Sequence, residues 1–362
     1  MASKRLGRQT VRLEEPVSVV SFANIGGKQE ARGPLAAYFD ELNQDAYFGQ
    51  KSWEKGESAM QQFALQKAME KGGLRAEDLD YVLAGDLLNQ CIGTSFGLRD
   101  FKIPFYGLYG ACSTMAESLS LAAMAVEGGY AELAAAMTSS HFASAERQYR
   151  LPLEYGGQRT PTAQWTVTGS GAVLVGPNQA PPYIRGFTTG KIVDLKITDA
   201  NNMGAAMAPA FVDTVLGHFQ DTGLSPNDYD LIVSGDLGKV GKELARDLFR
   251  REGLSLGDKL DDCGTMIFDL ERQDVHAGGS GCGCSAVVLC GYLMEKLKTR
   301  KLRNILFCGT GALLSPVSTQ QGNPSPRSAM RWQSPWKAGV CDGVFERLYL
   351  RRHSLCHWAD FD

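Results

Sequence analysis

Two cysteines and one histidine stand where their side chains could do chemistry. Cys112 lies in the segment YGACSTMAE, between small residues and at the start of an expected helix. The free N–H groups and positive potential of a helix N-terminus lower the pKa of a nearby thiol and favour the nucleophilic thiolate. They also suit an oxyanion or a ligand carboxylate. Cys112 is therefore a candidate site residue; the alternative is a small buried thiol that only fills space.

His276 and Cys308 both stand beside glycines. His276 precedes AGGSGCGC, in which Gly278 and Gly279 would let the backbone approach a ligand closely. A histidine there could act as a base or a hydrogen-bond donor, or it could simply cap the turn. Cys308 ends an expected strand before Gly309, where pocket residues lie in α/β proteins; a core thiol at the strand end is equally possible.

Several other side chains are weaker candidates. Asp86 and Asp236 end two expected strands, and we expect both to bind N–H groups of their own turns, although either could reach a ligand. His141 follows two serines and could line the pocket. An aromatic ligand would need an apolar wall, for which three residues just before the first cysteine are candidates: Phe105, Tyr106 and Tyr109.

The elements that would position these residues occur twice. LDYVLAGDL at 79–87 and YDLIVSGDL at 229–237 are apolar strands that end in Gly-Asp-Leu. A small residue followed by Cys-Ser then opens a helix, at 111–113 in the first half and 283–285 in the second. Two copies of one layout predict an α/β protein of two like halves, with a pocket where they meet.

Alternating strands and helices predict mixed sheets with helices in layers. Strands are expected at 17–25, 79–85, 166–176, 230–234 and 304–308, and helices at 54–71, 114–129, 209–221, 239–253 and 286–300. Thr114 and Glu117 form a capping pattern at the start of one helix. We divide the chain into an N-terminal half (1–178), a C-terminal half (179–321) and an atypical tail (322–362) that holds three of the five Trp.

Composition excludes some functions. The net charge of −3 gives no basic field, so nucleic acid is not an expected partner. The nine cysteines lack paired Cys-x-x-Cys spacing, so no metal site is predicted. No signal peptide and no apolar run of membrane-spanning length are visible. These features predict a soluble chain of cytoplasmic type with free thiols.

The chain resembles the thiolase superfamily, and within it the SpoVAD family of spore-forming bacteria. The segments AGDLLNQC, GACSTMAE, SGDLGKVG and VHAGGSGCGCSA carry the resemblance, which runs from about residue 5 to Gln321. It implies a thiolase-like fold of two internally duplicated halves. It also implies that Cys112 stands where a thiolase has its nucleophile, His276 near the Gly-His-Pro histidine and Cys308 near the acid/base cysteine.

The resemblance implies a function as well. SpoVAD-like proteins bind dipicolinic acid and its calcium chelate, and they help a membrane complex load it into the developing spore. The implied ligand is therefore dipicolinate, possibly with calcium, without a cofactor. The implied partners are the other SpoVA membrane proteins and a second copy of the chain, with peripheral attachment to the spore inner membrane.

Departures from the thiolase pattern favour binding over turnover. The Asn-Glu-Ala-Phe segment of thiolases is replaced by the Gly-Asp-Leu-Gly at 235–238, where the ketoacyl-synthase III branch carries a catalytic histidine. Ala277 replaces the proline after the histidine, and no loop that would cover coenzyme A is evident. Nucleophilic catalysis needs an activated thiolate, a base and oxyanion donors together.

Two alternatives stay open. One is an acyl-coenzyme A-dependent condensing acyltransferase, with Cys112 as nucleophile, His276 as base and Cys308 exchanging a proton with the second substrate. The other is a structural partner in a membrane complex with a vestigial pocket. The tail is a further departure, since the family ends in a short apolar strand soon after SPVSTQQG; we interpret it as a variant or fused C-terminus.

Overall fold

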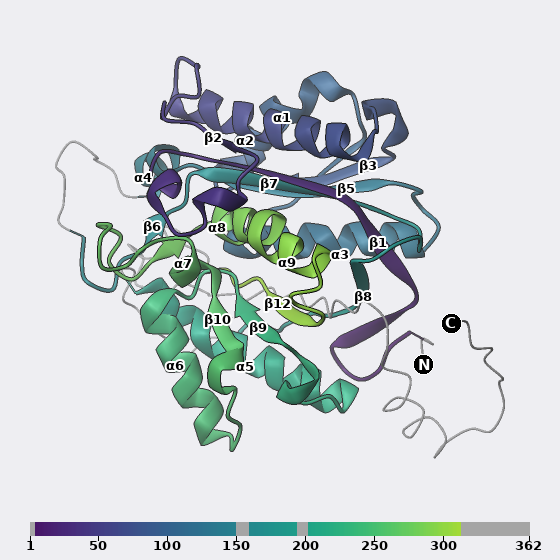
Figure 1. The fold of residues 1–362 in the computed structure, drawn as a ribbon, viewed down its shortest axis with the longest axis vertical. Helices are drawn as coiled ribbons and strands as arrows, with labels where there is room; N and C mark the ends of the chain where they lie inside the picture. The colour runs from purple at the N-terminus through teal and green to yellow at the C-terminus, as the bar shows by residue number, and fades with distance from the viewer. Residues whose placement is uncertain (1–3, 150–158, 194–201, 313–362) are drawn as a thin grey trace.

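A computed structural model describes residues 4–149, 159–193 and 202–312. Helices and sheets alternate in five layers (Figure 1). Helices α1 (Trp53–Gly72) and α2 (Ile92–Leu98) form one outer layer, and α5 (Met203–Thr222) and α6 (Gly238–Arg251) form the other. Between the two sheets lies a central helical layer. The layered α/β architecture predicted from the alternation of elements is confirmed.

The larger sheet belongs mainly to the first half of the chain. Its strands run in the order β2 (Glu41–Leu42), β1 (Thr10–Gly26), β7 (Gly169–Gly176), β5 (Ala134–Ser140), β3 (Tyr81–Gly85) and β4 (Phe105–Gly107). β3 is parallel to β4 and β5, whereas β7 is antiparallel to both β5 and β1. β8 (Tyr183–Thr188) pairs with β1, so a segment beyond residue 178 completes this sheet.

The second half supplies a smaller parallel sheet. Its order is β10 (Leu260–Asp262), β9 (Leu231–Ser234) and β12 (Ile305–Cys308). A separate short ladder joins the halves, because β6 (Trp165–Thr166) pairs in parallel with β11 (Gly279–Ser280). That ladder brings the residues before the second glycine- and cysteine-rich turn against the first half.

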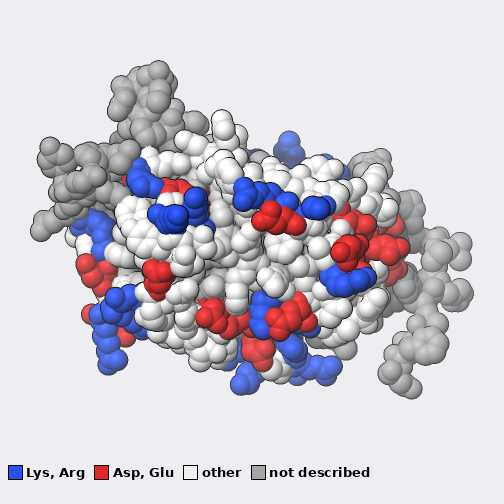
Figure 2. Space-filling view, turned by 90° about the horizontal axis from the view of Figure 1, so that it is seen from above, with Lys and Arg blue, Asp and Glu red and all other residues white. Residues whose placement is uncertain are grey.

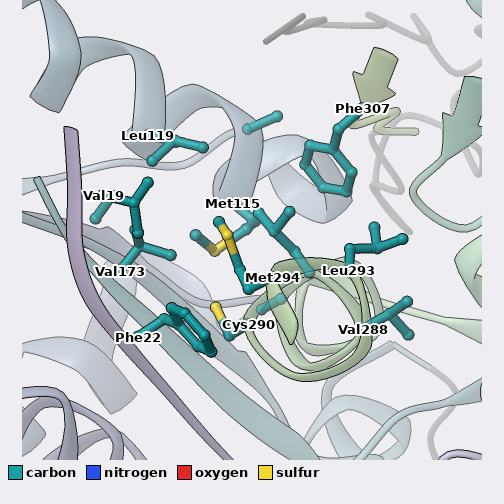
Figure 3. Packing of buried hydrophobic residues seen from close by; sticks show 14 of the residues in the cluster. Val19, Phe22, Met115, Leu119, Val173, Val288, Cys290, Leu293, Met294 and Phe307 are labelled. Carbon is teal, nitrogen blue, oxygen red and sulfur yellow. The ribbon is translucent and has the colours of Figure 1, made fainter. Parts of the chain in front are cut away.

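The central layer is built from α3 (Thr114–Glu127), α8 (Cys282–Val288) and α9 (Met294–Lys298), with a π-helical segment, Leu289–Leu293, between the last two. The short α4 (Phe142–Tyr149) and α7 (Cys263–Met266) lie at the ends of the layers. Side chains from both sheets pack on the central layer (Figure 3). They include Val19 and Phe22 of β1, Val173 of β7 and Phe307 of β12, which meet Met115, Leu119, Cys290, Leu293 and Met294.

The duplication extends to the helix ends. α1 stops at Gly73 and α5 at Gly223, and both glycines adopt a left-handed backbone, with φ of 66° and 72°. A short 3-10 turn follows each helix, Ala76–Asp78 in the first half and Pro226–Asp228 in the second, and leads into β3 or β9. The repeated Gly-Asp-Leu motif therefore ends equivalent strands, as predicted.

Two local expectations are wrong. Thr114 does not cap α3: its hydroxyl donates to Ala111 O at 2.7 Å, and the helix already begins at Thr114. The second Cys-Ser does not open its helix either, because α8 begins at Cys282 and places Cys284 inside the first turn. The tail at 322–362 lies outside the described residues.

The surface shows no region of one charge on the face drawn in Figure 2, where acidic and basic side chains are interspersed. Within the ranges that the structure describes, no helix combines the length and the apolar character needed to cross a membrane.

Candidate functional site

A small cavity of about 90 Å³ opens where the two halves meet. The first half lines it with Leu87, Tyr109, Ala111, Cys112, Ala145, Glu146, Tyr149 and Thr166, and the second half with Met203, Ser280 and Ala312. A space of this size holds several water molecules or one small ring. The prediction that a pocket would form between the halves, with Cys112 in it, is confirmed.

The turn before α3 positions Cys112. Residues Ala111–Ser113 form a 3-10 turn, and Ala111 has a left-handed φ of 50° that aims the next residue at the cavity. Gly309 of the second half packs closely against this turn. A Cβ on Gly309 would lie 2.8 Å from Ala116 Cβ and 3.2 Å from Ser113 Cα. Gly309 is thus needed for close packing under the cysteine.

Asp236 is the charged neighbour of Cys112. Its Oδ2 accepts from the Gly281 N–H at 3.0 Å and from the Ser280 hydroxyl at 3.2 Å. Its Oδ1 accepts from the Thr310 hydroxyl at 3.2 Å. The Cys112 thiol faces this same carboxyl group and the Gly281 N–H. A carboxyl group held by three donors therefore stands next to the thiol, where a nucleophilic cysteine would need a base.

These surroundings keep the thiol protonated. Burial, together with the negative charge of Asp236, raises the pKa of Cys112 well above its usual value. Burial also raises the pKa of Asp236 to about 7. The expectation that the helix start lowers the thiol pKa is wrong, because desolvation and a neighbouring carboxylate outweigh the helix potential. At neutral pH Cys112 is a weak hydrogen-bond donor rather than a nucleophile.

The two Gly-Asp-Leu aspartates have different roles. Asp86 accepts from the Leu88 N–H at 2.8 Å, which confirms that it binds its own turn. Asp236 does not: the N–H groups of the next two residues donate instead to Asp262, at 2.6 and 2.9 Å. Because Asp262 accepts the hydrogen bonds of this turn, the Asp236 carboxyl group can face the interface between the halves.

His276 does not line the cavity. Its Nδ1 lies 2.6 Å from Thr160 O and its Nε2 lies 2.9 Å from the Asp274 carboxylate. It adopts a left-handed φ of 51° at the start of the glycine-rich turn. These contacts direct the ring toward the segment before β6, away from the side chains around Cys112.

Cys308 and the glycines near His276 have packing contacts. Cys308 is fully buried in the core of the second sheet, and its carbonyl accepts from the Gly235 N–H at 2.9 Å. Gly278 has a φ of 110°, and a Cβ there would lie 2.6 Å from Gly264 O. Gly279 is part of the ladder with β6. The structure therefore groups Cys112 with Asp236 and Ser280, and it leaves the other proposed catalytic partners outside the cavity lining.

Of His141 and the three aromatic candidates before Cys112, Tyr109 alone is among the residues that line the cavity. His141 is buried with Nε2 2.7 Å from Ala46 O, and burial lowers its pKa, so it serves the packing behind α4. Tyr109 does line the cavity, and its hydroxyl lies 3.3 Å from that of Tyr149. The Tyr149 hydroxyl in turn donates to Leu87 O, which closes the wall.

The α4 side of the cavity was not foreseen. Ala145, Glu146 and Tyr149 recur at helical spacing in HFASAERQY, which directly follows the strand β5. A short helix after a strand end, with that spacing, places the three side chains on one face. This signal was available in the sequence. Glu146 is the one carboxylate in the described lining, and no cluster of three metal-ligating side chains occurs in the described ranges.

Comparison with known proteins identifies the family of the chain. Residues 7–330 match the family of stage V sporulation protein AD (SpoVAD). The chain is 45% identical over 326 residues to stage V sporulation protein AD of Bacillus subtilis (strain 168), which covers 90% of this chain and 96% of the relative.

Solved structures show the same fold at low identity. 3-Oxoacyl-(acyl carrier protein) synthase III, FabH, of Xanthomonas oryzae pv. oryzae is similar with a TM-score of 0.58 and 14% identity, covering 89% of this chain and 99% of that one. Cerulenin-bound OleA of Xanthomonas campestris has a TM-score of 0.57 and 13% identity, covering 89% and 97%. The predicted thiolase-like fold is confirmed, and the chain belongs to the stage V sporulation protein AD (SpoVAD) family.

Proposed function

We propose that the chain binds dipicolinate and its calcium chelate in the Cys112 cavity and supports dipicolinate uptake into the developing spore. Membership of the sporulation family supports the biological setting. The observation that carries the choice of binding over catalysis is the pairing of Cys112 with Asp236. A protonated thiol beside an acid, with no histidine in the described lining, favours a binding pocket over a condensing enzyme.

The cavity offers both parts of such a ligand a partner. Tyr109, Tyr149 and Leu87 form an aromatic and apolar wall, on which a pyridine ring can pack. Thr166, from the ladder that joins the halves, also lines the cavity and brings a hydroxyl group, whereas the Ser280 hydroxyl beside it already donates to Asp236. Hydroxyl donors to an ionised carboxylate make short, charge-assisted hydrogen bonds.

Glu146 favours the calcium chelate over the free dianion. Its side chain lies in the cavity lining, where a carboxylate repels the negative charge of dipicolinate. Calcium takes six to eight oxygen ligands, so a chelate still has positions for other oxygens. The same carboxylate is therefore attractive to the chelate.

Calorimetric titration with dipicolinate, with and without calcium, tests this proposal. We expect saturable binding that is tighter with calcium. Thr166→Val should weaken binding about tenfold or more, because a hydrogen bond to a charged group contributes roughly 1.5–3 kcal/mol. Glu146→Gln should reduce the advantage of the chelate over the free acid. Cys112→Ala should change affinity only a few-fold, through packing.

His276→Ala is the matched control, because His276 lies beside the glycine-rich turn that contains Ser280 and does not line the cavity. It should leave the affinity unchanged. Incubation with acyl-coenzyme A followed by intact mass spectrometry examines the alternative activity. An acyl adduct on Cys112 would overturn the binding proposal in favour of a condensing acyltransferase, and absence of any binding would favour a purely structural role.

We further propose that the chain pairs as a homodimer through β4 and attaches to the spore inner membrane through the other SpoVA proteins. β4 is an edge strand, and its residues Phe105 and Tyr106 do not line the cavity but are exposed, Tyr106 by 57%. Phe96 of α2 is exposed as well, by 52%. An exposed apolar edge strand is suited to pairing with its own copy across a two-fold axis.

Sedimentation equilibrium should therefore show a dimer that Tyr106→Asp converts to a monomer. The charge would be buried at the shared edge, where it has no partner. Tyr130→Asp is the control, because Tyr130 is 78% exposed and lies outside β4. A monomeric wild-type protein, or equal effects of both changes, would contradict pairing through β4.

A further inference from the structure

Behind the cavity wall lies a pair of buried carboxyl groups that the proposed binding does not use. Glu57 of α1 and Asp86 after β3 are both fully buried. A Cβ placed on Gly93 would lie 3.3 Å from Asp86 Oδ2 and 3.6 Å from Glu57 Cδ, so both carboxyl groups border one point. Two ionised carboxylates this close in the interior repel each other, which favours a pair that holds one proton.

Glu57 is hydrogen-bonded to the wall of the cavity that α4 forms. The Ser144 hydroxyl of α4 donates to Glu57 Oε2 at 2.7 Å, and the Ser139 hydroxyl of β5 donates to Oε1 at 3.0 Å. Ser144 directly precedes Ala145 and Glu146, and Tyr149 follows on the same short helix. The position of the α4 wall therefore depends on a hydrogen bond to Glu57.

Asp86 is hydrogen-bonded to the second wall, which is the segment around Leu87. Its carboxyl group accepts from the Leu88 N–H at 2.8 Å and from the Thr94 N–H at 2.7 Å. Leu87 directly follows Asp86 in the chain and lines the cavity. Its carbonyl accepts a hydrogen bond from the Tyr149 hydroxyl. Each carboxyl group thus holds one of two walls that meet at the Leu87–Tyr149 contact.

Gln61 couples the two acids. Its Nε2 donates to the Ser139 hydroxyl at 2.7 Å and to the Thr94 hydroxyl at 2.8 Å. Those hydroxyls donate onward, Ser139 to Glu57 and Thr94 to Asp86. The hydroxyl groups of Ser139 and Thr94 therefore connect the two acids through Gln61, so a change of charge on one acid acts on both walls.

We propose that Glu57 and Asp86 are positioning residues, which hold the two cavity walls together while the pair carries one proton and push them apart by mutual repulsion when that proton is lost. This inference rests on the proposed function of the cavity for its effect on the ligand, but its effect on the walls can be measured without ligand.

The surroundings of the pair determine the pH at which that proton is lost. Burial and the charge of Asp86 together raise the pKa of Glu57 to about 8, although the two serine hydrogen bonds act in the opposite direction. Burial likewise raises the pKa of Asp86. The other titratable groups that face the pair are Glu54 of α1, which is ion-paired with Arg147 of α4, and the thiols of Cys91 and Cys282. Burial raises the pKa of both thiols above its usual value, so they stay protonated in this range.

The affinity for dipicolinate should therefore fall as pH rises from 7 to 9. The binding-competent fraction declines from about nine-tenths to about one-tenth across two pH units centred on the pKa, which is a loss of about ninefold in apparent affinity. The ligand's own carboxylates are ionised throughout this range. In Glu57→Gln, which carries no titrating proton, most of this loss should disappear. Glu70→Gln is the control, because Glu70 lies on the same helix with an exposed side chain.

Hydrogen–deuterium exchange of the unliganded protein gives the second readout. Amides of α4 and of residues 86–91 should exchange several-fold faster at pH 9 in the wild type than in Glu57→Gln at the same pH, where intrinsic rates are equal. Ser144→Ala should speed exchange of α4 at both pH values, because it removes the contact without changing the charge. Equal exchange in wild type and Glu57→Gln, or an unchanged α4 in Ser144→Ala, would overturn the inference even if dipicolinate proved not to bind.

Discussion

The folded protein should lose stability as pH rises from about 5 to about 8. Burial raises the pKa of Glu30 and of Asp236 to about 7, and that of Asp262 to about 6. In the unfolded chain the same groups titrate near pH 4. Between these values the folded state binds more protons than the unfolded state, so the free energy of unfolding falls with increasing pH.

The effect reverses at low pH. Hydrogen bonds and ion pairing lower the pKa of Asp45, Glu54 and Asp221. The stability that these groups contribute is present above their unfolded pKa and is lost as pH falls through their folded pKa. The two trends together place the stability maximum on the acid side of neutrality, near pH 5.

Urea unfolding at pH 5, 6, 7 and 8 measures the slope. We expect a decrease on the order of 2 kcal/mol for each fully buried group with a raised pKa. Glu30→Gln should make the slope shallower, because it removes a fully buried carboxyl group whose pKa is raised by burial. Asp100→Asn, at an exposed side chain, should leave the slope as it is. A stability that rises from pH 5 to 8 would contradict the assignment.

The fold was largely predictable because its signals are local. The strands before each Gly-Asp-Leu, the glycine after α1 and the cysteine at the start of α3 all have sequence signatures that the structure confirms. The cavity between the halves followed from duplication alone. Tertiary neighbours could not be predicted in this way, and they decide how Cys112 behaves. Its pKa depends on Asp236, which comes from the other half of the chain.

Polar side chains on the buried face of α1 were a signal that the sequence analysis did not use. Glu57 and Gln61 lie on the buried face of α1 with Met60 and Ala64, although their side chains are polar. Polar residues at core-facing positions of a helix need partners, so they mark an internal network. Identifying those partners required the folded chain, because Asp86, Ser139 and Ser144 come from three other segments.

The two equivalent glycines of the repeat should respond very differently to the same substitution. Gly85→Ala should destabilise the protein by about 3 kcal/mol or more, because the new Cβ would lie 1.9 Å from Leu108 O. That carbonyl cannot retreat easily, since the Leu108 N–H is bonded to Ala84 O at 2.8 Å. Leu108 also precedes Tyr109, so the strain would reach the cavity wall.

Gly235→Ala is the internal control, in the same Gly-Asp-Leu motif. A Cβ there would meet Ser285 Cβ at 3.3 Å and Gly309 Cα at 3.4 Å, contacts that small shifts can relieve. We expect a loss of about 1 kcal/mol or less. Thermal and urea unfolding of the two variants measure the contrast. If both changes cost the same, the requirement for glycine would come from the turn itself, and the close approach of the β4–α3 connection to β3 would not be its cause.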